Sequence, residues 1–184
     1  APGVFDTAST FTQFRASSAS IAALDPTTCS SIAAPTVTTA FGNYTLTLVA
    51  GKVNVWNLTL AQITAMGNVS GPTNASAATP LVINVTDAGS ITLPERYWGP
   101  LQSGTKSAIM WNFPNATAVN VRGVFYGSLF APDAAVSIDN VTFEGDVVAK
   151  TATITSGKYG LAHWTTAIPC TLGALSVQGP GSLA

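Results

Sequence analysis

Apolar and polar residues alternate in short runs through the second half of the chain, from Ser107 to Lys150. The alternation is clearest at residues 119–121, 136–138 and 141–143, where valine, isoleucine or phenylalanine flanks a single Asn, Ser or Thr. Glycine, proline, asparagine or aspartate interrupts the pattern every few residues. Strict alternation over so few residues predicts half-buried strands rather than helix.

The apolar positions recur with the period of a stacked coil. Seventeen residues separate Val119 from Val136, and eighteen separate Val136 from Ile154. This spacing is short for a pair of hairpins, but it suits one turn of a solenoid, in which each turn stacks its apolar face on the next. The sequence therefore predicts a mainly β fold, a right-handed parallel β-helix, or β-solenoid.

One long helix is predicted near the start of the chain, over residues 5–24, where Asp6 can cap the first turn. Its larger apolar residues share one stripe at helical spacing: Phe11, Phe14, Ile21 and Leu24. The serines between them are indifferent helix formers, so packing must hold this helix in place. The pair Asp25-Pro26 ends it.

The segment between this helix and the central block predicts further strands. Threonines alternate with leucines between Thr36 and Leu60, which indicates strands with one buried face. Residues 61–78 are rich in Gly, Ser, Asn and Ala, so we expect a loop that bulges from the coil. Residues 81–85 form a nearly continuous apolar run, typical of an inner strand. Residues 92–105 fit a second loop.

The length of 184 residues is ordinary for one domain. We therefore predict a single β-solenoid domain at residues 1–170, which includes the helix, and a tail at residues 171–184. The start at Ala1-Pro2-Gly3, with no visible signal peptide, is expected of a mature or trimmed exported chain.

Charge is scarce in this chain. Charged residues make up 8% of it, against about a quarter in ordinary globular domains, while hydrophobic residues make up 47%. The formal net charge of −1 leaves no basic surface for phosphate backbones, so a nucleic-acid partner is not expected. No apolar run approaches the roughly 20 residues of a membrane span.

The two cysteines, Cys29 and Cys170, lie far apart in the sequence. They could be buried free thiols, but in an exported protein a disulfide that ties the region after the helix to the end of the solenoid is expected. Closing so large a loop stabilises the fold by about 4 kcal/mol on the chain-entropy model.

Seven of the ten asparagines stand two positions before a Ser or Thr: Asn43, Asn57, Asn68, Asn74, Asn84, Asn115 and Asn140. Chance predicts about two such sites when Ser and Thr make up about a fifth of a chain. The pattern favours N-glycosylation of an exported protein. Asn-x-Thr is also what a strand with a polar outer face looks like, and both interpretations stay open.

Three motifs in the central block carry a resemblance to a known family. They are Trp111-Asn112-Phe113-Pro114, then Gly127-Ser128 with Ala131-Pro132, and then Gly145 with Ala149-Lys150. In this order and at this spacing they resemble the choice-of-anchor A domain. That domain is an adhesive β-solenoid of bacterial and fungal surface proteins, related in architecture to ice-binding β-helices.

The resemblance covers roughly residues 5–168 and includes the strand at residues 53–57. It implies surface attachment, no defined catalytic residues, and a helix along the solenoid wall, with Phe11 and Phe14 in the core. Family members usually carry several coils before this helix, whereas this chain begins almost at the helix. The resemblance therefore implies N-terminal coils that were removed or that another subunit supplies, and an open end on that side of the stack.

Candidate catalytic chemistry is thin. His163 is the single histidine, so a catalytic triad or a histidine-rich metal site would depend on it, and a packing role is expected instead. Four carboxylates could hold Ca²⁺ from adjacent coils, although turn chemistry explains each equally well: Asp133, Asp139, Glu144 and Asp146. Arg122 and Lys150 could serve a polysaccharide lyase, but their spacing selects neither. We predict no catalytic residue, no metal and no cofactor.

Three non-enzymatic functions fit the sequence. The first is an adhesive module at the cell surface that touches glycans. The second is an ice-binding module acting as a monomer, in which residues 45–47 and 151–155 carry threonine ladders that Asn120, Ser137 and Asp139 interrupt. The third is a secreted structural subunit that assembles with copies of itself into a fibre or layer. In that case apolar residues of the tail would dock on the next subunit: Leu172, Leu175 and Val177.

Overall fold

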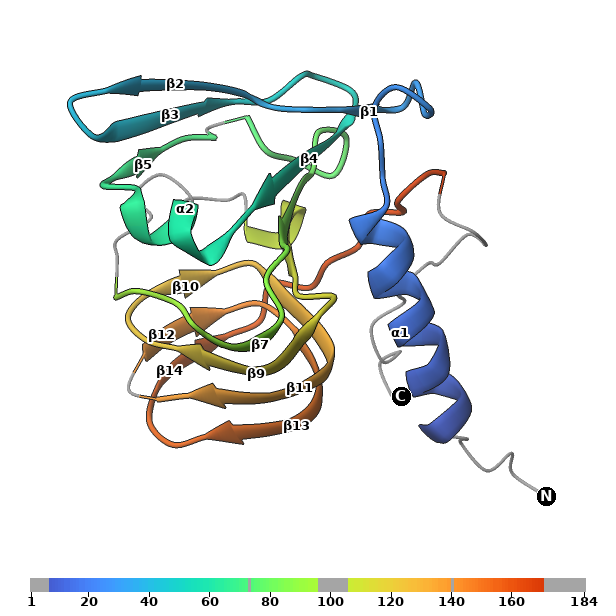
Figure 1. The fold of residues 1–184 in the computed structure, drawn as a ribbon, viewed down its shortest axis with the longest axis vertical. Coiled ribbons are helices and arrows are strands. Elements are labelled where there is room, and N and C mark those ends of the chain that lie inside the picture. Colours follow the sequence, from blue (N-terminus) through green and yellow to red (C-terminus); the bar gives the residue numbers. More distant parts are fainter. Residues whose placement is uncertain (1–6, 73, 96–105, 140, 171–184) are drawn as a thin grey trace.

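The computed structural model describes residues 7–72, 74–95, 106–139 and 141–170 of the chain (Figure 1). It is mainly β, with parallel sheets and one long N-terminal helix, α1 (Thr7–Ala22). This confirms the predicted class and the predicted helix. The cap residue Asp6 and the tail at 171–184 lie outside the described residues.

Three sheets surround the interior. The largest has the order β1-β4-β6-β8-β11-β9-β7, with β13 also paired to β11. Its strands are β1 (Ile32–Ala33), β4 (Val53–Leu58), β6 (Leu81–Val85), β7 (Gly89–Thr92), β8 (Ile109–Asn112), β9 (Ala116–Val121), β11 (Ser128–Ile138) and β13 (Val147–Ile154). The second sheet contains β10 (Phe125–Tyr126), β12 (Val141–Glu144) and β14 (Gly157–Gly160), and the third contains β2 (Thr36–Ala40), β3 (Asn43–Thr47) and β5 (Val69–Ser70). Among these described strands, β2 and β3 alone pair antiparallel.

The strands stack in successive layers along the long axis of the molecule (Figure 1). The long strand β11 pairs with β8 through its first half and with β9 through its second, because it continues across the corner where β8 and β9 are separate strands. Val136 lies opposite Val119, as the 17-residue spacing predicted. The next step was wrong by two residues, since Ile154 lies opposite Ile138 and not opposite Val136. A bulge in β11 between Ala131 and Ala135 shifts that register.

The apolar residues of the alternations at 119–121 and 136–138, together with Phe143, point into one shared core. Trp111 and Phe113 are among the largest fully buried side chains, and Phe125 stacks on Phe143 of the next layer with ring centroids 5.2 Å apart. All five residues of β6 are buried, as its continuous apolar run predicted. Layers that stack apolar side chain on apolar side chain remove this surface from water, which is the main stabilising contribution of the fold.

A row of three asparagines, two of them buried, attaches α1 to the largest sheet. Asn57, Asn84 and Asn112 occupy the same register position in β4, β6 and β8. The Asn84 amide donates to Asn57 Oδ1 at 2.8 Å, and the Asn112 amide donates to Asn84 Oδ1 at 2.9 Å. We call these three residues the asparagine ladder.

The helix completes the hydrogen bonds of the asparagine ladder. Ser18 is 2% exposed, and its hydroxyl donates to Asn112 Oδ1 at 2.6 Å while its carbonyl accepts from the Asn112 amide at 3.0 Å. The carbonyl of Ile21 accepts from Asn84 at 3.3 Å. The serines that weaken this segment as an isolated helix thus include the one that fixes it to the sheet. Phe11 and Phe14 are half-buried rather than core residues, since the face turned to the sheet is centred on Ser17, Ser18 and Ile21.

The expected loop at residues 61–78 contains a short helix, α2 (Leu60–Ala65). Thr59 and Gln62 form a capping box, in which each side chain bonds the other residue's backbone N–H. The Leu60 N–H donates to a carboxylate oxygen of Asp87 in the next layer, at 2.6 Å. The prediction of a loop was wrong because this start signal was read as part of a strand.

Glycines allow the layers to approach closely at one corner. Gly127 has a φ of +102°, which an L side chain rarely adopts. A Cβ on Gly145 would collide with the carbonyl of Gly127 in the layer before it. The two glycines that the resemblance singled out are therefore required by backbone conformation and by layer spacing.

The disulfide between Cys29 and Cys170 is present, with their Cα atoms 6.2 Å apart. It joins the turn after α1 to the segment that follows β14. That segment, residues 161–170, runs back from the last layer towards α1 (Figure 1). The predicted pairing is confirmed.

Candidate functional site

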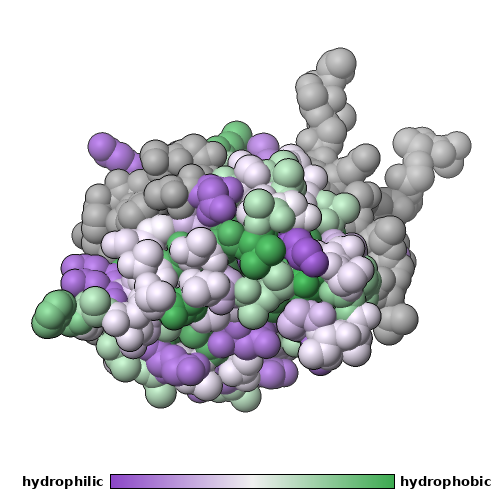
Figure 2. All heavy atoms as spheres, turned by 90° about the horizontal axis from the view of Figure 1, so that it is seen from above, coloured by the Kyte–Doolittle hydropathy of each residue, from purple (hydrophilic) through white to green (hydrophobic). Residues whose placement is uncertain are grey.

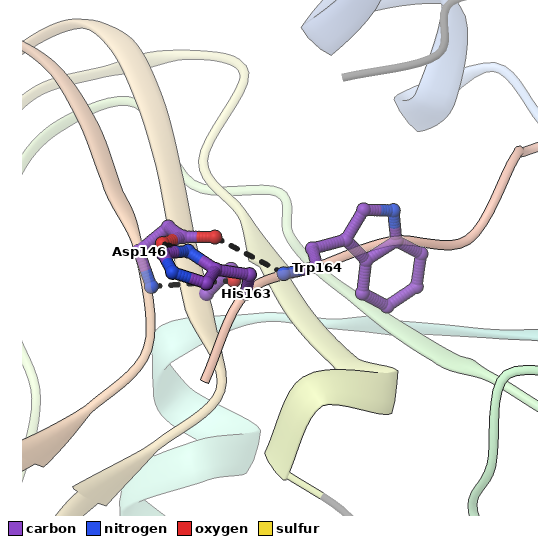
Figure 3. A network of polar contacts seen from close by, with 4 residues as sticks. Asp146, His163 and Trp164 are labelled. Carbon is purple, nitrogen blue, oxygen red and sulfur yellow. Dashed lines mark hydrogen bonds and ion pairs between the residues drawn. The ribbon is translucent and has the colours of Figure 1, made fainter. Parts of the chain in front are cut away.

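The histidine of this chain lies in a polar cluster on the returning segment (Figure 3). His163 Nδ1 is 2.7 Å from one oxygen of the Asp146 carboxylate, and the backbone N–H of Trp164 donates to the other oxygen at 3.0 Å. The His163 side chain is 47% exposed, whereas the indole of Trp164 is buried with Ile21 and Cys29. The packing role expected of His163 therefore falls to Trp164, because the two neighbouring side chains point to opposite sides of the segment.

The Asp146 cluster fastens the returning segment and offers no nucleophile. Both oxygens of Asp146 are occupied by groups of the protein itself. Within the described ranges, no serine or threonine hydroxyl bonds to His163. The arrangement holds the last layer to the segment that leads to the disulfide, and it does not have the form of a Ser-His-Asp triad.

The four acidic residues considered for calcium have four separate partners: Asp133 pairs with Arg15, Glu144 with Lys106, Asp139 with Thr155, and Asp146 with His163. Across the described part of the chain, no three His, Cys, Asp or Glu side chains are grouped to hold a metal ion. The carboxylates thus act as local links between layers or between a layer and α1.

Five sequon asparagines lie exposed on the described surface: Asn43, Asn57, Asn68, Asn74 and Asn115. Asn84 is a correction, because it is 0% exposed and its amide nitrogen donates to Asn57 and to Ile21. A glycan on that nitrogen does not fit this packing. Asn140 lies outside the described residues.

The hairpin of β2 and β3 carries a regular set of exposed threonines. Thr36 lies opposite Thr47 and Thr38 lies opposite Thr45, while the intervening Leu46 is buried. We call these four threonines the threonine face. Seen from this end, the face is largely pale, with scattered apolar and hydrophilic patches (Figure 2).

A second polar row crosses the largest sheet and is less regular. Thr92, Asn120, Ser137 and Thr153 lie in register on β7, β9, β11 and β13. Two of the three predicted interruptions, Asn120 and Ser137, are thus in the middle of this row. The side chain in this row therefore changes from one layer to the next, whereas an ice-binding ladder would repeat the same residue in every layer.

Strand β13 leaves a long edge at the last described layer. Residues 150–154 are exposed, although their counterparts Val136 and Ile138 in β11 are buried. Among the described residues, no strand pairs with the outer edge of β13. The open end was expected on the N-terminal side of the stack, but the long unpaired edge of the described chain lies at the other end.

Most residues of the three motifs serve the fold. Trp111 packs in the core and donates through its indole to the Tyr126 carbonyl at 3.2 Å, and Asn112 belongs to the asparagine ladder. Sequence reasoning missed that ladder. The available signal was an asparagine in three apolar strands at spacings of 27 and 28 residues. The proposed docking residues Leu172, Leu175 and Val177 lie outside the described residues.

The described helices include none that is both long and apolar enough to cross a membrane. A family model with the description "Putative Ice-binding-like adhesive domain" matches residues 1–161. No curated protein matches the chain, and no solved structure does.

Proposed function

The chain belongs to the ice-binding-like adhesive domain family, and from this premise we propose that it is a non-catalytic subunit of an extracellular adhesive fibre or layer. The adhesive family and the disulfide together indicate an extracellular protein. An adhesive domain implies binding rather than catalysis. The finer steps, which are the solenoid architecture, the choice-of-anchor A assignment, the surface contact and the self-association, are our proposal.

The solenoid assignment is supported by the parallel stacking of successive layers. Residues of β8, β11 and β13 follow one another in register at intervals of 18 residues, such as Trp111, Leu129 and Val147. A parallel neighbour at this short interval requires the chain to complete one circuit in each layer. The three motifs with their structural roles support the choice-of-anchor A assignment within the adhesive family.

The threonine face is the observation that carries adhesion. Its four hydroxyls stand in two rows on a two-stranded ribbon, and the strand geometry fixes their spacing. Hydroxyl and methyl groups presented in this way suit a neutral, hydroxyl-rich surface such as a polysaccharide. Because charges are few, the contact should depend little on salt.

Adhesion is tested with immobilised neutral polysaccharide and single lysine substitutions. Thr45→Lys places a long charged side chain in the centre of the threonine face, beside Thr38, and should abolish retention at 150 mM salt. Thr117→Lys changes an exposed threonine of β9 elsewhere and should retain binding. Equal retention of both variants would refute this role of the face.

A second candidate is a monomeric ice-binding or glycan-binding module, which the paired threonines of the hairpin also favour. It is distinguished by thermal hysteresis and by sedimentation. A monomer at high concentration that shapes ice crystals would support the second candidate and refute the first. Concentration-dependent assembly without thermal hysteresis would support the first.

A further inference from the structure

The unpaired edge of β13 is suited to a partner of its own kind. The strand has eight residues, with Lys150 as its one charged side chain. Exposed edges of this length are normally protected by charge, proline or a covering element. The strand and the segment after it also expose apolar surface: Ile154 at the end of β13 is 50% exposed, and Tyr159 and Leu161, which follow in the chain, are 45% and 81% exposed.

Two backbone hydrogen bonds define which groups of β13 point away from the stack. The N–H of Leu129 donates to the carbonyl of Asp146, and the N–H of Thr155 donates to the carbonyl of Ile138. Residues 146 and 155 therefore face β11. Because the N–H and C=O groups of successive residues in a strand point to opposite edges, the outward groups belong to Val147 and Ala149 before the corner, and to Ala152 and Ile154 after it.

The same four residues also point into the core. Val147 and Ala149 follow the buried Leu129 and Ala131 in register, and Ala152 and Ile154 follow the buried Val136 and Ile138: these pairs continue the inner rows of the stack. All four are apolar. At this end of the stack the free hydrogen-bonding groups thus coincide with the uncovered inner side chains.

Resting on the proposed self-association, we propose that two copies join end to end through β13, paired antiparallel about a two-fold axis between residues 150 and 151. In this register Val147 lies opposite the partner's Ile154, and Ala149 lies opposite the partner's Ala152. Both pairs bring outward N–H and C=O groups together, as the hydrogen-bonded pairs of an antiparallel ladder require. The inner side chains of one copy then continue the core of the other.

The charges and the edge lengths favour this arrangement. Lys150 lies opposite the partner's Thr151, so the register opposes no like charges. A head-to-tail joint would need an equal edge at the other end of the same sheet, where the terminal strands are β1 with two residues and β7 with four. An isologous joint uses the same edge twice and needs no second matching surface.

Cross-linking tests the register directly. Val148 and the partner's Thr153 form a non-hydrogen-bonded pair, whose Cα atoms lie about 4.5 Å apart, within the range of a disulfide. The variant with Val148→Cys and Thr153→Cys should form a covalent dimer on oxidation. Val148→Cys with Thr117→Cys is the matched control and should stay monomeric in non-reducing mass spectrometry. No dimer, or equal dimer from both, would overturn the joint.

Association in solution provides the second measurement. Ala152→Lys should weaken dimerisation at least tenfold in sedimentation equilibrium, because it places a charge in the joint. Thr117→Lys, an exposed position of β9 away from this edge, should change it little. The wild type could associate while the Val148→Cys, Thr153→Cys variant forms no covalent dimer and Ala152→Lys does not weaken association. In that case this joint is wrong and the proposed self-association stands. A wild type that is monomeric throughout refutes both. If deleting residues 171–184 creates the association, that segment covers the edge, and the proposal is refuted.

Discussion

Replacing Asn112 by alanine removes the centre of the attachment between α1 and the sheet. Asn112 is 0% exposed and takes part in three hydrogen bonds, two with Ser18 and one with Asn84. Truncation leaves the Ser18 hydroxyl and the side-chain oxygen Oδ1 of Asn84 buried without this partner. Each such loss costs about 1–3 kcal/mol. We expect Asn112→Ala to lower the free energy of unfolding by about 3–5 kcal/mol.

This loss is measurable by urea or thermal unfolding followed by circular dichroism with the disulfide intact. For a chain of this size, about 3–5 kcal/mol corresponds to a fall in Tm of roughly 6–20 °C. Asn115→Ala is the matched control, since Asn115 is exposed and makes one 3.2 Å bond to the Thr86 carbonyl. It should cost less than about 1 kcal/mol.

A double-mutant cycle of Asn112→Ala with Ser18→Ala separates the helix contact from the ladder. The two losses should be coupled by about 0.5–3 kcal/mol, as for residues in one hydrogen-bond network. If Asn112→Ala costs no more than Asn115→Ala, or if the two losses simply add, the asparagine ladder does not fix α1 to the sheet.

Three further predictions follow from the fold. Replacing Cys29 and Cys170 by serine should cost about 4–5 kcal/mol, seen in urea unfolding of the variant beside the oxidised wild type; a change under 1 kcal/mol would contradict it. Gly145→Ala should lower the Tm by several degrees because its Cβ meets the Gly127 carbonyl, and an unchanged melting curve would show that the layers separate easily. Expressed in a glycosylating host, the chain should carry glycans at exposed sequons and none at Asn84, as site-resolved mass spectrometry of the peptides will report; a glycan at Asn84 in folded protein would contradict the burial described.

The sequence predicted the strands well where alternation and burial agree. The run from Val119 to Val121 alternates because one side faces the core, and its partner at Val136 follows from the length of one circuit. The partner of Ile154 was not predictable in this way, since the bulge in β11 changes the number of residues per circuit. The short helix α2 was missed because its start signal, Thr59 with Gln62, lies within a leucine–threonine alternation that also fits a strand.

The candidate site residues likewise include some that the sequence predicted and some that it did not. The disulfide followed from two cysteines and the chemistry of exported proteins. The role of Asn84 did not, because an asparagine two positions before a threonine looks the same whether it is exposed or buried. Asn84 is buried because α1 packs over it, and its amide donates to the carbonyl of Ile21, which lies 63 residues earlier in the chain. Local pattern does not contain that contact.

The disulfide also determines how the molecule responds to mechanical force. Cys29 and Cys170 enclose every described layer, so tension applied to the chain on either side would pass through the covalent bond and bypass the strands between. In the oxidised form, the chain between the cysteines cannot be extended by force. Their sequence separation of 141 residues corresponds to about 480 Å of extended chain, which a single-molecule pulling experiment would release after reduction. Among the described helices and strands, α1 alone lies outside the bond and would bear the load. An adhesive domain built in this way can be pulled from its surface without being unravelled.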